Sequence, residues 1–199
     1  IEIYDDKEYI TRYEWNRFYK EYGQYINGDF VQFDEIGMEM FIPDSLVSVD
    51  VSEDMKNQYF IGIFVEDEDD WTYNVAVQYV DAISFKGIDE YKDYVEDLDE
   101  AGQMDIDIIG TALINDNEFL VYEIKDTDTG VVGIPLENGV LEVVFSNISD
   151  DDFMDKVTCV IPSIRKIKSE DTESIQEDID THIDTEADNI DMDDIDDNN

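Results

Sequence analysis

Short runs of β-branched and aromatic residues, separated by turn residues, fill most of the chain between residues 30 and 145. In the run at 72–80, Tyr73, Val75, Val77 and Tyr79 alternate with smaller or polar residues. A period of two is typical of a strand with one apolar face, so the sequence predicts a β-sheet. The other predicted strands are 47–51, 59–65, 106–114, 119–124, 131–136 and 140–145.

Two hairpins are predicted from turn residues. Asn138-Gly139 stands between the last two apolar runs, and this dipeptide is the strongest short-range hairpin signal in the chain. Nearer the N-terminus, apolar runs from Phe30 to Ile42 bracket the loop Asp34–Gly37. Pro43 is expected to stop the second of these runs because proline lacks the N–H that a sheet requires.

Between Gly87 and Gly102 the apolar spacing changes to that of a helix. Residues three and four apart lie on one helix face, so an amphipathic helix is predicted over 88–101. Acidic residues fill its first turn, and Gly102 is suited to ending it. The apolar face consists of Ile88, Tyr91, Val95 and Leu98.

A last helix is predicted from Ser149 as its N-cap, followed by three aspartates in the first turn. Its apolar stripe is expected to pack on the sheet. Pro162 is predicted to end or kink the helix near Ile161. The stripe consists of Phe153, Val157, Val160, Ile161 and Ile164.

Residues 5–26 are predicted to form an N-terminal helix opened by Asp5 and Asp6. Its aromatic stripe has two interpretations. It packs on the body of the same protein, or it forms a face that binds a partner protein. The stripe consists of Trp15, Phe18, Tyr22 and Ile26.

The chain carries 54 acidic residues against 12 Lys+Arg, a formal net charge of −42. Binding to a phosphate backbone depends on Lys and Arg, so direct nucleic-acid binding is not expected. Anionic membrane surfaces are disfavoured for the same reason, and no apolar run is long enough for a membrane span. Expected partners are basic proteins, cations or sites that normally hold a polyanion, unless the charge only confers solubility.

Residues 169–199 contain 14 of the acidic residues and none of the Lys or Arg residues, which leaves −28 for residues 1–168. This composition predicts a disordered acidic tail. Isolated apolar residues recur in the tail at helical spacing. They are either chance features of a solubilising segment or anchors that fold against a basic, grooved partner. The candidate anchors are Ile175, Ile179, Ile183, Ala187 and Ile190.

The order of these elements resembles the PsbP-like or DcrB-like superfamily, which has the Mog-type fold. The similar segments are Ile42-Pro43-Asp44-Ser45, Leu141–Ser146, the acidic helix start Asp150–Phe153, and Ile161-Pro162-Ser163-Ile164. The resemblance covers about residues 30–165. It implies an α+β fold with an antiparallel sheet flanked by helices on both faces, and a role as an accessory, chaperone or partner-binding module, often exported, rather than an enzyme. The expected domains are 1–29, an aromatic-rich N-terminal helix, 30–168, the α+β domain, and 169–199, the tail.

Residues for catalysis and cofactor binding are sparse. The single histidine, His182, lies in the tail, and Cys159 is expected to be a buried apolar residue rather than a nucleophile. One His and one Cys cannot build a zinc site, and glycine-rich phosphate loops are missing. No cofactor is expected. Asp126–Gly130 imitates a calcium loop, but Gly130 falls at a ligand position, so a β-turn is predicted. Glu66–Asp70 is predicted to be a solvated acidic loop, and weak Ca²⁺ binding there is the alternative that is not expected.

Two functions fit this pattern. The first is a non-catalytic accessory or protein-binding module. The second is an acidic mimic of a nucleic acid that occupies the basic cleft of a partner protein. Because the chain starts at Ile1, export or a cell-surface location after removal of a leader is expected, with the cytoplasm as the alternative.

Overall fold

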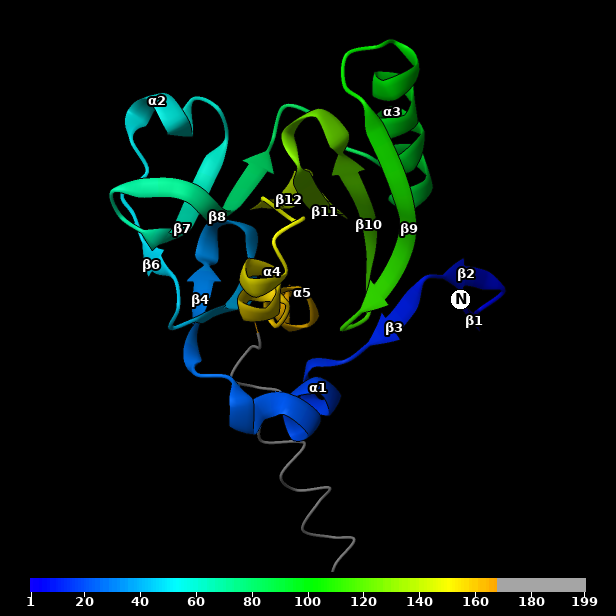
Figure 1. Cartoon of the computed structure of the whole chain (residues 1–199). Helices are drawn as coiled ribbons and strands as arrows, with labels where there is room; N and C mark the ends of the chain where they lie inside the picture. Colours follow the sequence, from blue (N-terminus) through cyan, green and yellow to red (C-terminus); the bar gives the residue numbers. More distant parts are fainter. Residues whose placement is uncertain (168–199) are drawn as a thin grey trace, which may run out of the picture. The chain divides into compact units, whose positions relative to one another are not determined.

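An eight-stranded sheet organises residues 1–167, the part of the chain that the computed structural model describes (Figure 1). The strand order is β3-β9-β10-β11-β12-β8-β7-β6. Its strands are β3 (Thr11–Tyr13), β6 (Val47–Ser48), β7 (Phe60–Asp67), β8 (Asp70–Val80), β9 (Ile106–Ile114), β10 (Asn117–Ile124), β11 (Thr129–Leu136) and β12 (Gly139–Ser146).

The sheet is mixed. Strand β3 runs parallel to β9, and the pairings from β9 onward are antiparallel. The α+β class is confirmed, and the prediction of an antiparallel sheet requires correction at this edge. The predicted strand 47–51 is shortened to the two residues of β6. A one-turn helix, α2 (Glu53–Lys56), follows it and is capped by the Ser52 side chain.

The predicted hairpin near the N-terminus forms a second sheet. Its strands are β4 (Gly28–Phe33) and β5 (Met38–Pro43), joined by a 3₁₀ turn at Asp34–Ile36, and β13 (Arg165–Lys166) pairs with β5. All residues of β5 are buried. Gly37 has φ 65°, a left-handed conformation that glycine adopts without steric cost, and it closes the turn.

The N-terminal helix predicted for 5–26 is wrong over its first half. Residues 2–9 form a small hairpin, β1 (Glu2–Tyr4) and β2 (Lys7–Tyr9), and β3 then joins the main sheet. Asp5 and Asp6 have φ 49° and 63°, so they form the hairpin turn instead of a helix cap. Only α1 (Trp15–Tyr22) is helical, with a 3₁₀ turn after it at Gly23–Tyr25. Pairing of β2 with β1 and of β3 with the edge of β9 takes the place of the predicted helix over these residues.

Helix α3 (Ile88–Glu100) agrees closely with the predicted helix. Its residues Ile88, Tyr91 and Val95 pack on β9, β10 and β11 in one apolar cluster. Within this cluster the Tyr91 and Tyr122 hydroxyl groups donate hydrogen bonds to Glu142 Oε1, at 2.5 and 3.2 Å. Gly133 lies opposite Glu142, and a Cβ at Gly133 would lie 2.3 Å from the Tyr91 hydroxyl oxygen. Glycine is therefore needed there for space.

The last predicted helix is divided into α4 (Asp151–Val157) and α5 (Val160–Ser163). Asp150, rather than Ser149, is the N-cap, and its carboxylate accepts a hydrogen bond from Phe153 N. The break at Thr158 and Cys159 precedes Pro162, which lies inside α5. A proline ring clashes with the carbonyl four residues earlier, so Pro162 displaces the helix at Thr158 instead of ending it at Ile161. Both helices contribute to the main core with β5, β8 and β12.

Candidate functional site

The site begins with the turn between β9 and β10. Asn115 and Asp116 both have positive φ, 47° and 61°, which is the two-residue hairpin turn favoured by right-twisted strands. Asn115 Oδ1 accepts a hydrogen bond from Trp15 N at 2.7 Å, and Asn115 Nδ2 donates to the carbonyls of Pro162 and Ile164, both at 2.9 Å. One side chain therefore fixes the start of α1 and the end of α5.

Trp15 anchors α1 to the body. It is 6% exposed and belongs to a cluster with Phe41 and Cys159. Its ring lies 5.3 Å from that of Phe41 and 5.4 Å from that of Phe30. Edge-to-face and tilted aromatic pairs at these distances are favourable beyond the area that they bury. A further hydrogen bond, from Phe41 N to Ser163 Oγ at 2.8 Å, joins β5 to α5.

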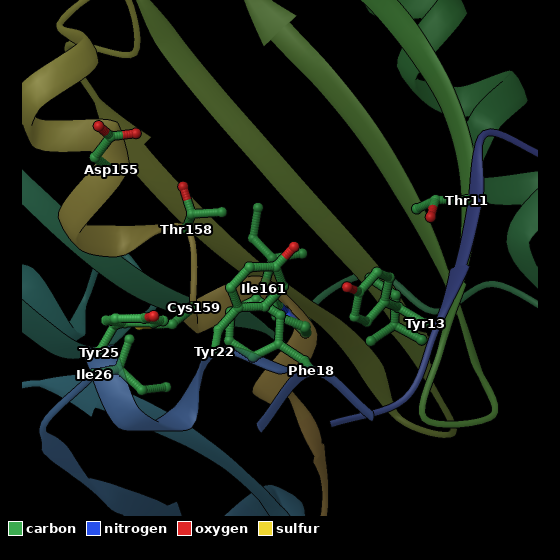
Figure 2. Close-up of a pocket in the computed structure, with 12 residues that line it drawn as sticks. Thr11, Tyr13, Phe18, Tyr22, Tyr25, Ile26, Asp155, Thr158, Cys159 and Ile161 are labelled. Carbon is green, nitrogen blue, oxygen red and sulfur yellow. The ribbon is translucent and has the colours of Figure 1, made fainter. Parts of the chain in front are cut away.

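A pocket of about 600 Å³ lies between α1, β3 and the α4–α5 segment (Figure 2). We call it the α1–α5 pocket. Figure 2 shows Tyr25 and Ile26 at one side, Tyr22, Phe18 and Ile161 in the middle, Tyr13 and Thr11 towards the other side, and Asp155 and Thr158 above Tyr25. The lining residues are Thr11, Tyr13, Phe18, Tyr22, Tyr25, Ile26, Ile114, Asp155, Thr158, Cys159, Ile161 and Pro162.

The polar side chains in the lining of the α1–α5 pocket are three tyrosines, two threonines, Cys159 and Asp155. Tyr22 and Tyr25 are 41% and 76% exposed, so their rings are open to a ligand. A hydrogen bond to Glu21 raises the pKa of Tyr22. Burial raises the pKa of the Cys159 thiol to about 11, which keeps it protonated at neutral pH and makes it a poor nucleophile. Asp155 is the one carboxylate in the lining.

The structure separates the predicted aromatic stripe into two parts. Trp15 packs on the body, while Phe18 and Tyr22 line the pocket, with their rings 5.1 Å apart. The first interpretation holds for Trp15, and partner binding by Phe18 and Tyr22 stays a prediction. The candidate anchors Ile175, Ile179, Ile183 and Ile190 lie outside the described residues, as does His182.

Sequence reasoning missed the residues that hold this site together. The signal for Asn115 was available, because Asn and Asp tolerate left-handed φ and Asn115-Asp116 separates two apolar runs. Its three hydrogen bonds join residues about 50 and 100 positions away, which no local pattern reveals. Tyr13 falls within the helix predicted for 5–26 and is instead on strand β3.

The calcium-like segment Asp126–Gly130 forms the predicted turn between β10 and β11. It contains a 3₁₀ turn at Lys125–Thr127, and Asp128 has φ 48°. The Asp128 carboxylate accepts hydrogen bonds from the backbone N and the hydroxyl group of Ser149. Within residues 1–167, no group of three or more His, Cys, Asp or Glu side chains is placed to hold a metal ion. The helices described there are also too short or too polar to span a membrane.

No protein-family model matches the chain, and no curated protein matches it. Solved structures that are similar to it include the following two. The solution structure of cyanobacterial PsbP (CyanoP) from Synechocystis sp. PCC 6803 is 14% identical, covers 69% of this chain and 91% of its own, and has a TM-score of 0.47. The Ran-binding protein Mog1p of Saccharomyces cerevisiae is 10% identical, covers 72% of this chain and 97% of its own, and has a TM-score of 0.43. These findings agree with the predicted PsbP-like, Mog-type resemblance and concern the fold alone.

Proposed function

We propose that this chain is a non-catalytic protein-binding module whose α1–α5 pocket receives an apolar side chain from a basic segment of a partner protein. The observation that carries the proposal is the pocket itself, a cavity of about 600 Å³ with the rings of Tyr13, Phe18, Tyr22 and Tyr25 in its lining. Tyrosine and tryptophan are enriched at protein interfaces because each offers a large apolar surface with one polar end.

Charge supports a basic partner. Residues 1–168 carry a formal charge of −28, and Asp155 lies in the pocket lining. A positively charged segment would be attracted by this field, which raises the rate of encounter and excludes acidic competitors. The apolar side chain in the pocket would then provide the affinity.

The same proposal includes the domain organisation. Residues 1–29 supply β3 and α1 to the site, 30–168 form the α+β domain, and 169–199 are an acidic tail. We place α3 on one face of the main sheet and α4–α5 on the other. This placement is supported by the alternation of Leu120 and Tyr122 with Phe119 and Val121 between the two apolar clusters.

Mimicry of a nucleic acid is the less supported alternative. A mimic needs its carboxylates in a band that follows a duplex. Exposed carboxylates occur instead on α2, α3 and α4 and in the turns that join β4 to β5 and β7 to β8. This spread favours the binding module.

The proposal is tested by selecting peptides from a random display library with the full chain, then measuring their affinities by fluorescence anisotropy. The variant Tyr22→Ala/Tyr25→Ala removes two exposed pocket rings. Tyr19→Ala is the matched control, because Tyr19 is 52% exposed on the same helix and does not line the pocket. Selected peptides should combine an aromatic or aliphatic residue with Lys or Arg.

Binding should weaken about tenfold or more in the double variant, as expected for the loss of two interface tyrosines, and change little in Tyr19→Ala. Equal affinities for the parent and the double variant would refute the assignment of the pocket. If the selected peptides share Lys or Arg but no aromatic or aliphatic residue, the proposal that the pocket receives an apolar side chain is wrong.

A further inference from the structure

A second pocket, of about 810 Å³, lies between α2, the β4–β5 turn and strands β7 and β8. It shares no lining residue with the α1–α5 pocket. Figure 1 shows α2 and α1 at opposite ends of the view. Four of its lining side chains are aromatic, namely Phe33, Tyr59, Phe60 and Tyr79, and three are carboxylates, namely Asp34, Glu35 and Asp81. We call it the tyrosine–carboxylate pocket.

The backbone at Tyr59 is held in an unusual conformation. Tyr59 has φ 69°, a value that bulky residues rarely adopt because of steric strain. Hydrogen bonds hold it from both sides, from Tyr59 N to Lys56 O and from Tyr79 N to Tyr59 O, both at 2.9 Å. Just after it, the pairing of β7 with β8 shifts register between Phe60 and Gly62. Bulges and strained residues of this kind are concentrated next to functional sites, where they aim side chains.

Close packing also positions Phe33 on the β4–β5 side. A Cβ at Gly62 would lie 3.0 Å from the Phe33 ring, so the ring occupies the space that the glycine leaves. The aromatic lining therefore comes from both sheets, with Phe33 on β4 packed against Gly62 of β7.

The charges in this pocket leave an excess of carboxylate. Lys56 is the one basic residue in the lining, and its ammonium group already pairs with Glu53 Oε1 at 2.7 Å. Asp34, Glu35 and Asp81 are exposed at the pocket, and none of them forms an ion pair within residues 1–167. A cation that enters would meet carboxylates and aromatic rings together.

We propose that the tyrosine–carboxylate pocket binds the cationic side chain of a lysine or arginine on a partner protein. The aromatic rings attract a cation through their negative faces, and the carboxylates add Coulomb attraction. The methylene stem of the side chain can lie against Phe33 and Phe60 while its charged end reaches the carboxylates. A side chain with an uncharged end would lose both the cation–π attraction and the Coulomb attraction, and an anionic side chain would be repelled.

The test uses peptides with a single charge, because a long polycation would bind so acidic a protein anywhere. The probes are acetyl-Gly-Lys-Gly-amide and acetyl-Gly-Arg-Gly-amide, with acetyl-Gly-norleucine-Gly-amide as the neutral analogue. Binding to the full chain is followed by two-dimensional ¹H–¹⁵N NMR. The expected result is saturable shifts at Tyr59, Tyr79 and Asp81 with the two cationic peptides and none there with the norleucine peptide.

Two variants locate the binding. Asp34→Asn/Asp81→Asn should raise the dissociation constant about fivefold or more, and Tyr79→Leu about threefold, which is the size of one exposed cation–π contact. Asp93→Asn/Asp97→Asn is the matched control, because it removes the same charge from exposed positions on α3. The control should change the dissociation constant less than the pocket pair, and amide spectra of all variants establish that they are folded.

Equal weakening by the pocket pair and the α3 pair would overturn the proposal, because it would reduce the binding to general attraction by the acidic surface. Shifts spread over all faces of the protein, or equal binding of the norleucine peptide, would overturn it as well. Spermidine is added as a further probe. If it saturates the site while neither cationic peptide does, the partner is a free polyamine and the protein-segment assignment is wrong.

Discussion

Replacing Asn115 by alanine should loosen α1 and α5 together, because the Asn115 side chain is bonded to both. The substitution removes the acceptor for Trp15 N and the donor to the carbonyls of Pro162 and Ile164. It also places alanine at φ 47°, where a Cβ is unfavourable and asparagine is better tolerated.

The expected loss of stability is about 4 kcal/mol. Three hydrogen bonds contribute about 1 kcal/mol each, and the left-handed backbone costs alanine about 1 kcal/mol more. Two control variants separate the contribution of the hydrogen bonds from that of the backbone conformation. Asn115→Gly keeps the backbone conformation and should lose about 3 kcal/mol. Asp116→Ala occupies the neighbouring left-handed position, at φ 61°, and should lose only about 1 kcal/mol.

Urea unfolding measures these differences, and amide hydrogen exchange locates them. Protection at Trp15, Arg17 and Phe18 should fall in Asn115→Ala and Asn115→Gly. Trp15 fluorescence gives a local reading in a Trp71→Phe background, which removes the other tryptophan. If Asn115→Ala and Asp116→Ala proved equally stable, Asn115 would be only a turn residue, and the account of how α1 is positioned would be wrong.

Three further predictions concern the core. Val157→Ala should destabilise the fold by about 2 kcal/mol through lost burial and a residual cavity, as read from its urea midpoint, since Val157 is fully buried; an unchanged midpoint would contradict this. Gly133→Ala should cost about 1–3 kcal/mol in a thermal melt, because the new methyl group would lie 2.3 Å from the Tyr91 hydroxyl oxygen. Alkaline pH should also destabilise the protein. Burial first, and then the charge of Glu142, raise the pKa of Tyr91 and Tyr122 above the ordinary value of 10.0, and burial raises that of Cys159 from 9.0 to about 11. Because each folded-state pKa is raised, folding favours the protonated form of these groups. Their contribution to the free energy of unfolding is fully present below about pH 9 and declines as the pH rises beyond it. Urea unfolding at several pH values between 8 and 11 measures this decline.

Local patterns were reliable where burial and periodicity agreed. Helix α3 begins at Ile88 as predicted, because its apolar spacing and acidic first turn favour the same structure. The hairpin at Asn138-Gly139 also forms, but Glu137 and Asn138 make its turn and Gly139 is the first residue of β12. A Cβ at Gly139 would lie 2.6 Å from the Val80 carbonyl oxygen, so glycine at this position allows the close approach of strand β8.

The N-terminal residues show the limit of such patterns. Tyr9, Tyr13 and Trp15 all fall within the helix predicted for 5–26, yet the first two are in strands and only Trp15 is in a helix. The free edge of β9 decides this, since Ile10 N bonds Thr111 O at 2.8 Å and β3 pairs with residues 112–114. The edge is about 100 residues away in sequence, and no window of local propensity includes it.

The sequence by itself determined the class of fold, the acidic character of the surface and most of the strands, because these depend on the period of apolar residues and on composition. The tertiary structure alone decided the two pockets. The α1–α5 pocket depends on Asn115, which joins three distant segments, and the tyrosine–carboxylate pocket on a strained Tyr59 beside a β-bulge. Both arise where separate elements meet, and such contacts are fixed by packing in three dimensions and not by the spacing of residues along the chain.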